Sequence, residues 1–186
     1  MNADGASDAV LVIKGTSKRF LNPNSGLGDD IFDTNPRILI ILFKDKIGGK
    51  YRLARQSDTF IVPPDSPVSS EPFQNISISH GVLKLDFELW QSAGSWFAEN
   101  ASYKFRYHEG EFQLIGADTT EVRRNTGDTE TRSYNFLTNR VKISKGNYSD
   151  NKRDRITWKT LPRRQLKTLI TFPAPFEWEI EPDIFI

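Results

Sequence analysis

Hydrophobic and polar residues alternate along most of the chain with a period of two. In residues 83–89, four apolar side chains alternate with three charged ones. Residues 103–107 repeat the pattern, with three aromatic rings separated by Lys104 and Arg106. Successive side chains of a β-strand point to opposite faces, so this period predicts strands with one buried and one solvated face.

Two short polar segments predict tight turns between such strands. Residues 108–111 (His-Glu-Gly-Glu) and 125–128 (Asn-Thr-Gly-Asp) each place a glycine between two alternating segments, which is typical of a β-hairpin. The strands expected around these turns and after them are residues 103–107, 112–115, 121–124, 129–136, 141–143, 156–158 and 168–172.

Two continuous apolar runs lie nearer the N-terminus. Residues 9–13 and 38–43 are rich in β-branched side chains and too short for typical helices, so they predict fully buried strands. A Gly-Gly pair separates the second run from a further short strand at 51–54. The polar segment 16–36 reads as a long loop with a short helix near residues 30–32.

The segment 63–73 contains four prolines and three serines and is typical of a linker. We therefore expect one domain over residues 1–186, with a subdivision into an N-terminal β unit (1–62) and a C-terminal antiparallel sheet (74–186). No stretch of eleven or more residues shows a helical stripe. The expected fold class is all-β or nearly so: an antiparallel, hairpin-rich sheet, as a sandwich or a partial propeller, with little helix.

Composition limits the chemistry. The 186 residues carry 25 Lys and Arg against 24 Asp and Glu, a net charge of +1, which argues against general polyanion binding. Cysteine is absent, so disulfides, thiolate catalysis and cysteine zinc sites are excluded. The 13 Phe, 5 Tyr and 4 Trp predict a core built from large rings, since all hydrophobic residues together make up only 37%.

No segment reads as a membrane span or a signal peptide. The longest apolar run has six residues, whereas a spanning helix needs about 20. The first fifteen residues contain two aspartates and lack a basic segment followed by an apolar one. Two interpretations remain: a cytosolic protein, or the mature part of an exported one.

The first eight residues combine oxygen side chains with a glycine. Asn2, Asp4 and Asp8 would offer hard oxygen ligands to calcium, and Gly5 would permit a sharp bend between them. The alternative is an ordinary Asx turn before a strand, since the same residue types favour turns for local reasons.

This segment resembles the calcium loop of FG-GAP-like repeats, which read Asp-x-Asn-x-Asp-Gly-x-x-Asp before a hydrophobic strand. Asn2, Asp4, Gly5 and Asp8 match, while the leading Asp would precede Met1. The resemblance implies calcium as a cofactor. One such loop cannot make a whole propeller, because each blade needs its own strands.

The order of the remaining chain is similar to a group of uncharacterised bacterial exported proteins. That likeness implies a periplasmic or secreted location and no known activity. The similar pieces are residues 37–43, 79–85, 95–96, 103–107 and 134–138.

Residues 140–168 form a basic stretch. Ten Lys and Arg residues against two Asp residues give this stretch +8 and leave −7 for the rest of the chain. A protein, an anionic glycan or, least favoured, a nucleic acid would suit such a surface. The alternatives are solvated strand faces, or an acidic C-terminal tail folded over the stretch. The candidate basic patch consists of Lys152, Arg153, Arg155, Arg163 and Arg164.

Trp90, Trp96 and Phe97 surround a Gly/Ser-rich loop at residues 91–95. Exposed aromatic rings beside such a loop can stack on sugar rings or anchor a protein partner. The alternative is that the three rings cap the core at strand ends.

Signals for catalysis are weak. His80 and His108 are the only imidazoles, and no nucleophile elbow, zinc motif or phosphate loop is present. Asp86 and Glu88 share a strand face as a glycosidase pair would, although solvation explains them as well.

The leading hypothesis is a non-catalytic binding module of the bacterial envelope or exterior, with a protein as ligand. The alternatives are a carbohydrate-binding domain that uses exposed tryptophan, and a hydrolase whose carboxylate pair the sequence does not locate.

Overall fold

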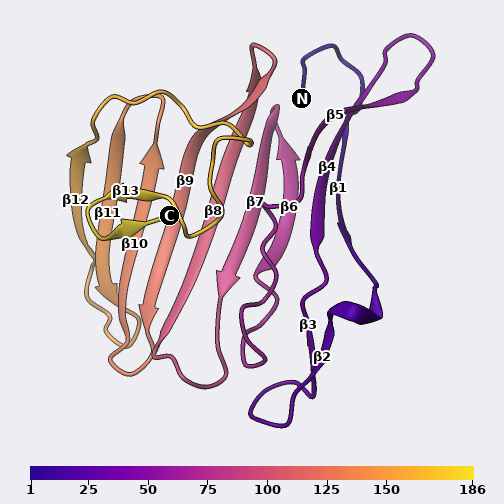
Figure 1. The fold of residues 1–186 in the computed structure, drawn as a ribbon. Helices are drawn as coiled ribbons and strands as arrows, with labels where there is room; N and C mark the ends of the chain where they lie inside the picture. Colours follow the sequence, from indigo (N-terminus) through magenta and orange to yellow (C-terminus); the bar gives the residue numbers. More distant parts are fainter.

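A computed structural model describes all 186 residues, and nearly all of its regular structure is antiparallel β. Its main feature is a seven-stranded sheet in which each strand pairs with the next along the chain (Figure 1). This meander confirms the predicted all-β class. Its strands are β6 (Phe73–Ser79), β7 (Val82–Leu89), β8 (Phe97–His108), β9 (Glu111–Arg123), β10 (Asp128–Asn135), β11 (Arg140–Asn147) and β12 (Arg155–Thr160).

The alternation in the sequence selects the buried face of this sheet. In β7, for example, Leu83, Leu85 and Phe87 are buried, and in β8 the same face carries Tyr103 and Phe105. We call this the core face. The two predicted hairpin turns occur where expected, because Gly110 and Gly127 have φ of 85° and 80°, which glycine adopts without steric cost.

A second sheet of three strands is formed by the N-terminal part of the chain. Its strands β1 (Ala9–Lys14), β4 (Arg37–Lys44) and β5 (Tyr51–Ser57) lie in the order β1-β4-β5. The prediction that residues 9–13 are fully buried is wrong, because β1 lies at the edge and leaves Leu11 and Ile13 nearly half exposed.

The polar segment between β1 and β4 is more regular than expected. It contains a 3-10 turn, η1 (Lys18–Phe20), and a two-stranded ribbon of β2 (Leu21–Pro23) and β3 (Ile31–Asp33). The helix predicted near residues 30–32 is therefore wrong, since Ile31 and Phe32 belong to a strand that pairs with β2.

One hydrophobic cluster of 23 buried residues contains side chains from both sheets and from the C-terminal segment. Phe60, which follows β5, packs edge-to-face against Phe87, Tyr103 and Phe105 at centroid distances of 5.4–6.0 Å. Such aromatic pairs add to the free energy of burial, so they hold the chain after β5 against the large sheet.

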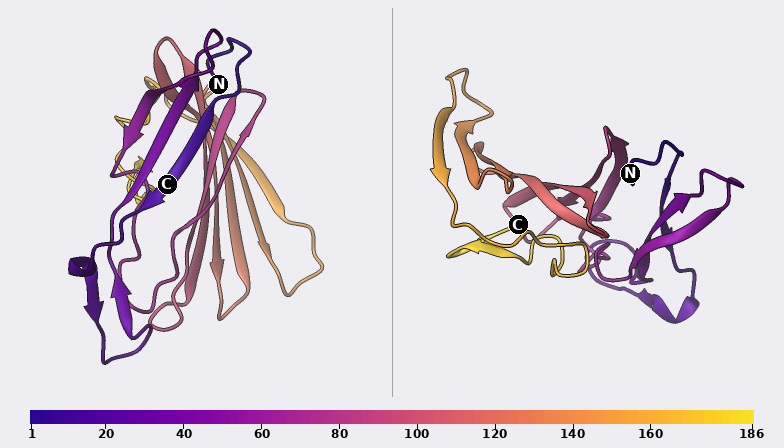
Figure 2. Two further views of the ribbon diagram at one scale, coloured as in Figure 1. Left: turned by 90° about the vertical axis from the view of Figure 1, so that its right-hand side faces the viewer. Right: turned by 90° about the horizontal axis from the view of Figure 1, so that it is seen from above.

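The C-terminal segment, residues 161–186, crosses the core face beside the N-terminal sheet (Figures 1 and 2). It ends in a small ribbon of β13 (Glu179–Glu181) and β14 (Ile184–Phe185). The strand predicted at 168–172 is wrong. Thr168 forms a single bridge to Gln113, and a turn follows in which Thr168 and Thr171 hydrogen-bond each other.

Candidate functional site

The core face changes from apolar to charged towards one end of the sheet. Glu99 lies two residues before Ala101 on β8, so the strand alternation places it on the same face as the buried Tyr103. Residues directly opposite one another form a row across six strands at this level. The row reads Leu89, Glu99, Glu121, Glu130, Lys145 and Arg155.

A groove of about 540 Å³ opens beside this row. Three parts of the chain form its walls: the proline-rich segment 62–72, the end of β7 with the start of β8, and the C-terminal residues 175–177. We call it the aromatic groove. Its lining includes Pro63, Pro64, Asp65, Ser69, Trp90, Gln91, Phe97, Glu99, Phe176 and Glu177.

A backbone hydrogen bond and one arginine position the aromatic wall. The Trp90 carbonyl accepts a hydrogen bond from the Ser70 N–H at 3.0 Å, which ties the proline-rich segment to the end of β7. Arg124 lies over the Trp90 ring at 5.6 Å and donates to the carbonyls of Gln91 and Ser95 at 3.0 and 2.6 Å. This arginine therefore fixes the loop between the rings, and it does not itself line the groove.

Three carboxylates and no Lys, Arg or His side chain line the aromatic groove. Asp65 accepts a hydrogen bond from Ser69. Glu99 is partly buried and has neither an ion-pair partner nor a hydrogen bond. Burial, and secondarily the negative charge of Glu121, raise the pKa of Glu99. The wall of the groove thus holds an acid whose charge nothing in the protein balances.

The C-terminal wall of the groove is fixed by the core. The Phe176 N–H donates to the Tyr103 hydroxyl at 3.0 Å, and Tyr103 is completely buried. Burial raises the pKa of Tyr103, so its hydroxyl stays protonated. Phe176 has φ of 68°, a conformation that side-chain-bearing residues rarely adopt and that surrounding contacts must stabilise.

A second hollow of about 340 Å³ adjoins the first and shares Glu99 with it. Its charges are paired: Arg132 contacts Glu130 at 2.5 Å, and Lys145 contacts the same carboxylate at 2.6 Å. Burial acts to raise the pKa of Glu130, but these two cations outweigh it and lower the pKa. This hollow therefore contains cations beside its glutamates, whereas no cation lines the aromatic groove.

The structure brings two of the three predicted aromatic residues into one site. Trp90 and Phe97 line the groove and are 38% and 43% exposed, so they do not simply cap the core. Trp96 is 64% exposed and lies outside the lining.

The five residues of the predicted basic patch do not form one cluster. Lys152, Arg153 and Arg155 lie at the start of β12, whereas Arg163 and Arg164 follow its other end. The expected contact with the acidic tail occurs at one point, where Lys159 approaches Glu181 at 3.5 Å.

The other candidates have local structural explanations. Asp86 accepts hydrogen bonds from Ser102 and Asn75 and pairs with Lys84. Burial acts to raise the pKa of Asp86, but these partners lower it. His80 and His108 are exposed at hairpin turns, and neither imidazole belongs to the groove lining.

The N-terminal loop uses its oxygen atoms internally. Asp4 accepts hydrogen bonds from the Ala6 N–H at 2.8 Å and from the Asn2 side chain at 2.9 Å. These contacts, the backbone one first, lower the pKa of Asp4. The Asp8 carboxylate pairs with the Met1 ammonium and accepts a hydrogen bond from the Lys44 N–H at 3.2 Å. No three His, Cys, Asp or Glu side chains are grouped to hold a metal ion. Calcium binding by Asn2, Asp4 and Asp8 stays a prediction.

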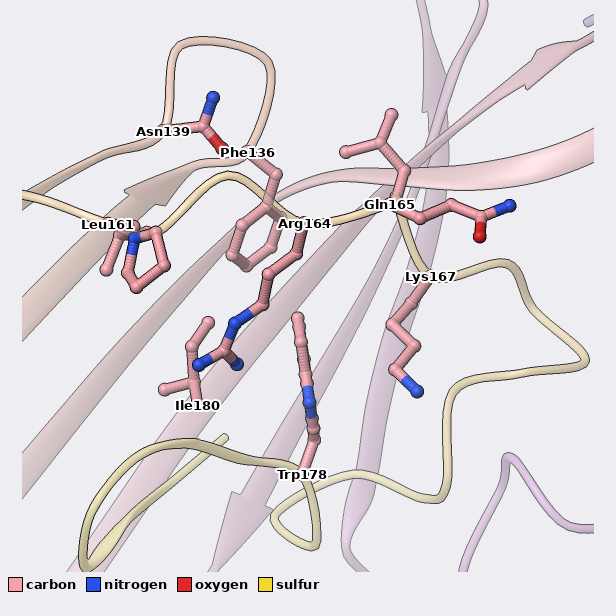
Figure 3. A pocket seen from close by; sticks show the side chains of 10 residues that line it. Phe136, Asn139, Leu161, Arg164, Gln165, Lys167, Trp178 and Ile180 are labelled. Carbon is pink, nitrogen blue, oxygen red and sulfur yellow. The ribbon is translucent and has the colours of Figure 1, made fainter.

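A small pocket beside the C-terminal ribbon is too small to be a ligand site. Its volume is about 20 Å³, close to the space that one water molecule requires. Figure 3 shows the side chains of Arg164 and Trp178 extending into it from opposite sides, with the guanidinium of Arg164 beside Ile180. An organic ligand would not fit.

Of the residues that line the groove, only Trp90 and Phe97 were predicted as site residues. Those missed include the three carboxylates, Asp65, Glu99 and Glu177, and the aromatic ring of Phe176. Only Glu99 could have been predicted from a local pattern. Every second residue before Tyr103 lies on the same face of the strand, which places Glu99 on the core face. The other three enter the groove through contacts between segments far apart in the sequence.

Comparisons of the chain with protein-family models, with curated proteins and with solved structures found no match. The structure contains no helix with the length and apolar character needed to cross a membrane. The fold and the aromatic groove are therefore the grounds for a functional proposal.

Proposed function

We propose that this chain is a non-catalytic binding module that holds an extended segment of a partner protein in the aromatic groove. The segment would carry Lys or Arg at the position facing Glu99. The single observation that supports this proposal most strongly is the lining, which combines aromatic rings and prolines with three carboxylates and no cation.

Each part of that lining suits a basic peptide. A cation over the face of Trp90 or Phe97 is attracted by the ring, with about 0.5–2 kcal/mol depending on desolvation. The same cation would neutralise Glu99, whose present neighbour across the strands is another glutamate. A groove lined by one sign of charge also raises the association rate of an oppositely charged ligand.

A neutral sugar fits the groove less completely. It could stack on Trp90 and donate hydrogen bonds from its hydroxyl groups to the carboxylates, but it would leave the charge of Glu99 uncompensated. Trp96, the second tryptophan expected in a sugar site, is outside the lining. A carbohydrate ligand is therefore the alternative outcome of the test below.

An array of decapeptides sorted by net charge, probed beside a glycan array, would test the proposal. We expect the bound peptides to be enriched in Lys and Arg. Trp90→Ala and Glu99→Gln should each weaken the best peptide at least tenfold, and the matched control Trp96→Ala should change its affinity less than twofold. Binding of glycans alone, or peptide binding that is indifferent to Trp90, would contradict the proposal.

One observation favours a second candidate, a glycoside hydrolase. Glu99 has a raised pKa and no cationic partner, whereas Glu121, directly opposite on β9, pairs with Arg123 at 3.6 Å. Two carboxyl groups in different surroundings on adjacent strands are the arrangement that a glycosidase needs for its proton donor and its nucleophile. Release of nitrophenol from aryl glycosides, lost in both Glu99→Gln and Glu121→Gln, would support it. Absence of turnover across a broad glycoside panel would count against it.

The envelope or extracellular location also remains a proposal. It is supported by the resemblance of the N-terminal segment to calcium loops of exported proteins. Detection of the native protein only in the cytosolic fraction of its cell would contradict it.

A further inference from the structure

The last strand of the large sheet has a free edge. β12 pairs with β11 alone, and no other strand lies beyond it (Figure 1). All six of its residues are exposed. An antiparallel edge strand directs half of its N–H and C=O groups outward, so β12 presents unpaired main-chain groups over about 20 Å, at about 3.3 Å per residue.

The two faces of β12 differ in chemistry. Ile156 and Trp158 point away from the core face and are 52% and 57% exposed. Trp158 is held in place by Arg140, whose guanidinium lies 4.8 Å from the ring centroid. An exposed, positioned tryptophan beside an isoleucine offers an apolar anchor to a neighbouring strand.

The core face of β12 carries Arg155 and Lys159. Lys159 forms one long ion pair, with Glu181 at 3.5 Å, while its side chain stays about half exposed, and Arg155 has no carboxylate partner. Arg153, Arg163 and Arg164, which flank the strand, are likewise in no ion pair. Of the residues 152–167, seven are basic and only Asp154 is acidic, and its carboxylate accepts a hydrogen bond from Ser144.

This charge distribution opposes pairing with a second copy. If two β12 strands paired antiparallel about Thr157, Arg155 of each copy would face Lys159 of the other. Like charges directly opposite one another destabilise a strand pair, which is how many proteins protect an edge from self-association. The same charges would stabilise an acidic strand.

We propose that β12 accepts an extended, acidic segment of a partner protein as an eighth strand of the sheet. Main-chain hydrogen bonds would supply much of the affinity, as in other cases of strand addition. Asp or Glu of the segment would face Arg155 and Lys159, and an apolar residue would cover Trp158. This site is separate from the aromatic groove and does not depend on its function.

The test uses synthetic heptapeptides of alternating Glu and Val, with alternating Lys and Val as the charge control. A third peptide is the acidic one N-methylated at every second residue, which blocks main-chain donation along one edge. At 150 mM salt, we expect the acidic peptide to bind at least tenfold more tightly than the other two. Bound peptide should slow amide exchange within residues 155–160.

Charge reversal makes the assignment specific. The double variant Arg155→Glu/Lys159→Glu should bind the acidic peptide at least tenfold more weakly and the Lys peptide more tightly. The gain for the Lys peptide would also show that the variant is folded. The control Lys50→Glu, on the exposed β4–β5 turn, should change the affinity for neither peptide. Equal binding of the N-methylated peptide, concentration-dependent dimerisation through β12, or preferential binding of a twelve-residue oligothymidylate would each overturn the proposal.

Discussion

Glu99 and Glu121 lie directly opposite each other on β8 and β9, on the face of the sheet that elsewhere holds the hydrophobic core. Like charges in this relationship destabilise a strand pair. Arg123 approaches Glu121 at 3.6 Å, whereas Glu99 has no cation. The repulsion between the two carboxylates is therefore uncompensated at Glu99, the acid that lines the aromatic groove.

Replacing this acid by its neutral analogue should stabilise the protein at neutral pH. Because the pKa of Glu99 is raised above its ordinary value of 4.5, the folded state holds the proton more tightly than the unfolded state. Stability therefore falls as pH rises through the window above 4.5 and stays lower at pH 7.

Glu99→Gln should raise Tm at pH 7 by about 1–2 °C, a modest gain because solvent screens a partly exposed group. At pH 4 the gain should vanish. Glu88→Gln, on the opposite face of β7, serves as the control. A gain of equal size at both pH values, measured by thermal denaturation, would show that charge is not its cause.

Tyr103→Phe should both destabilise the protein and disturb the groove. The substitution removes the hydroxyl that accepts the Phe176 N–H and leaves that donor unpaired, which typically costs about 1–3 kcal/mol. Urea denaturation should show a lower midpoint. Tyr107→Phe is the matched control, because the Tyr107 hydroxyl makes no hydrogen bond. Equal midpoints for the two variants would contradict the assigned role.

The strands from β7 to β11 could be predicted because each depends on a short-range alternation and a nearby turn. The strand predicted at 168–172 could not be corrected from the sequence. Its threonines have high strand propensity, but their hydroxyls close a local turn instead.

The groove was predicted only in its aromatic part. Trp90 and Phe97 come from adjacent strand ends, and their spacing in the sequence already suggests a shared site. Phe176 reaches the groove through a hydrogen bond to a residue 73 positions away, and no local pattern encodes that contact. Glu99 could have been found by extending the alternation of β8 to its start.

Gly28→Ala should be strongly destabilising. Gly28 has φ of 96°, and a Cβ atom at this position would lie 2.1 Å from the Pro67 carbonyl oxygen. The clash would separate the β2–β3 ribbon from the proline-rich wall of the groove. We expect a loss of about 2–4 kcal/mol, of which unfavourable φ explains about 1–2 kcal/mol.

Gly81→Ala measures how much stability is lost through an unfavourable φ alone. Gly81 also has a positive φ, 76°, but a Cβ atom there would meet nothing within 4 Å. Chemical denaturation of both variants should show the smaller loss for Gly81→Ala. Indistinguishable losses would mean that the close approach to Pro67 is unimportant.

Glu71→Gln should weaken the attachment of the proline-rich segment to β4. The Arg37 guanidinium is nearly fully buried and donates to Glu71 through Nε at 3.1 Å. Removing the carboxylate charge leaves a buried cation uncompensated, so we expect a loss of about 2–3 kcal/mol, below the usual cost for a fully buried pair because Glu71 is partly exposed. The control Glu109→Gln, at an exposed hairpin tip, should cost less than about 0.5 kcal/mol. Similar urea midpoints for both variants would contradict this account.

The calcium prediction is best tested at Asp4 and not at Asp8. Asp8 is almost fully buried and accepts hydrogen bonds from the backbone N–H groups of Asn2 and Lys44, so Asp8→Ala should lower Tm whether or not calcium is present. Asp4 contacts only Asn2 and Ala6 within its own turn, so Asp4→Ala should have a smaller effect in a chelator. If the loop binds calcium, millimolar calcium should raise the Tm of the unmodified protein, since a ligand specific for the folded state stabilises it, and Asp4→Ala should abolish the increase. A Tm that calcium leaves unchanged in the unmodified protein would remove the calcium hypothesis and leave the segment as an Asx turn.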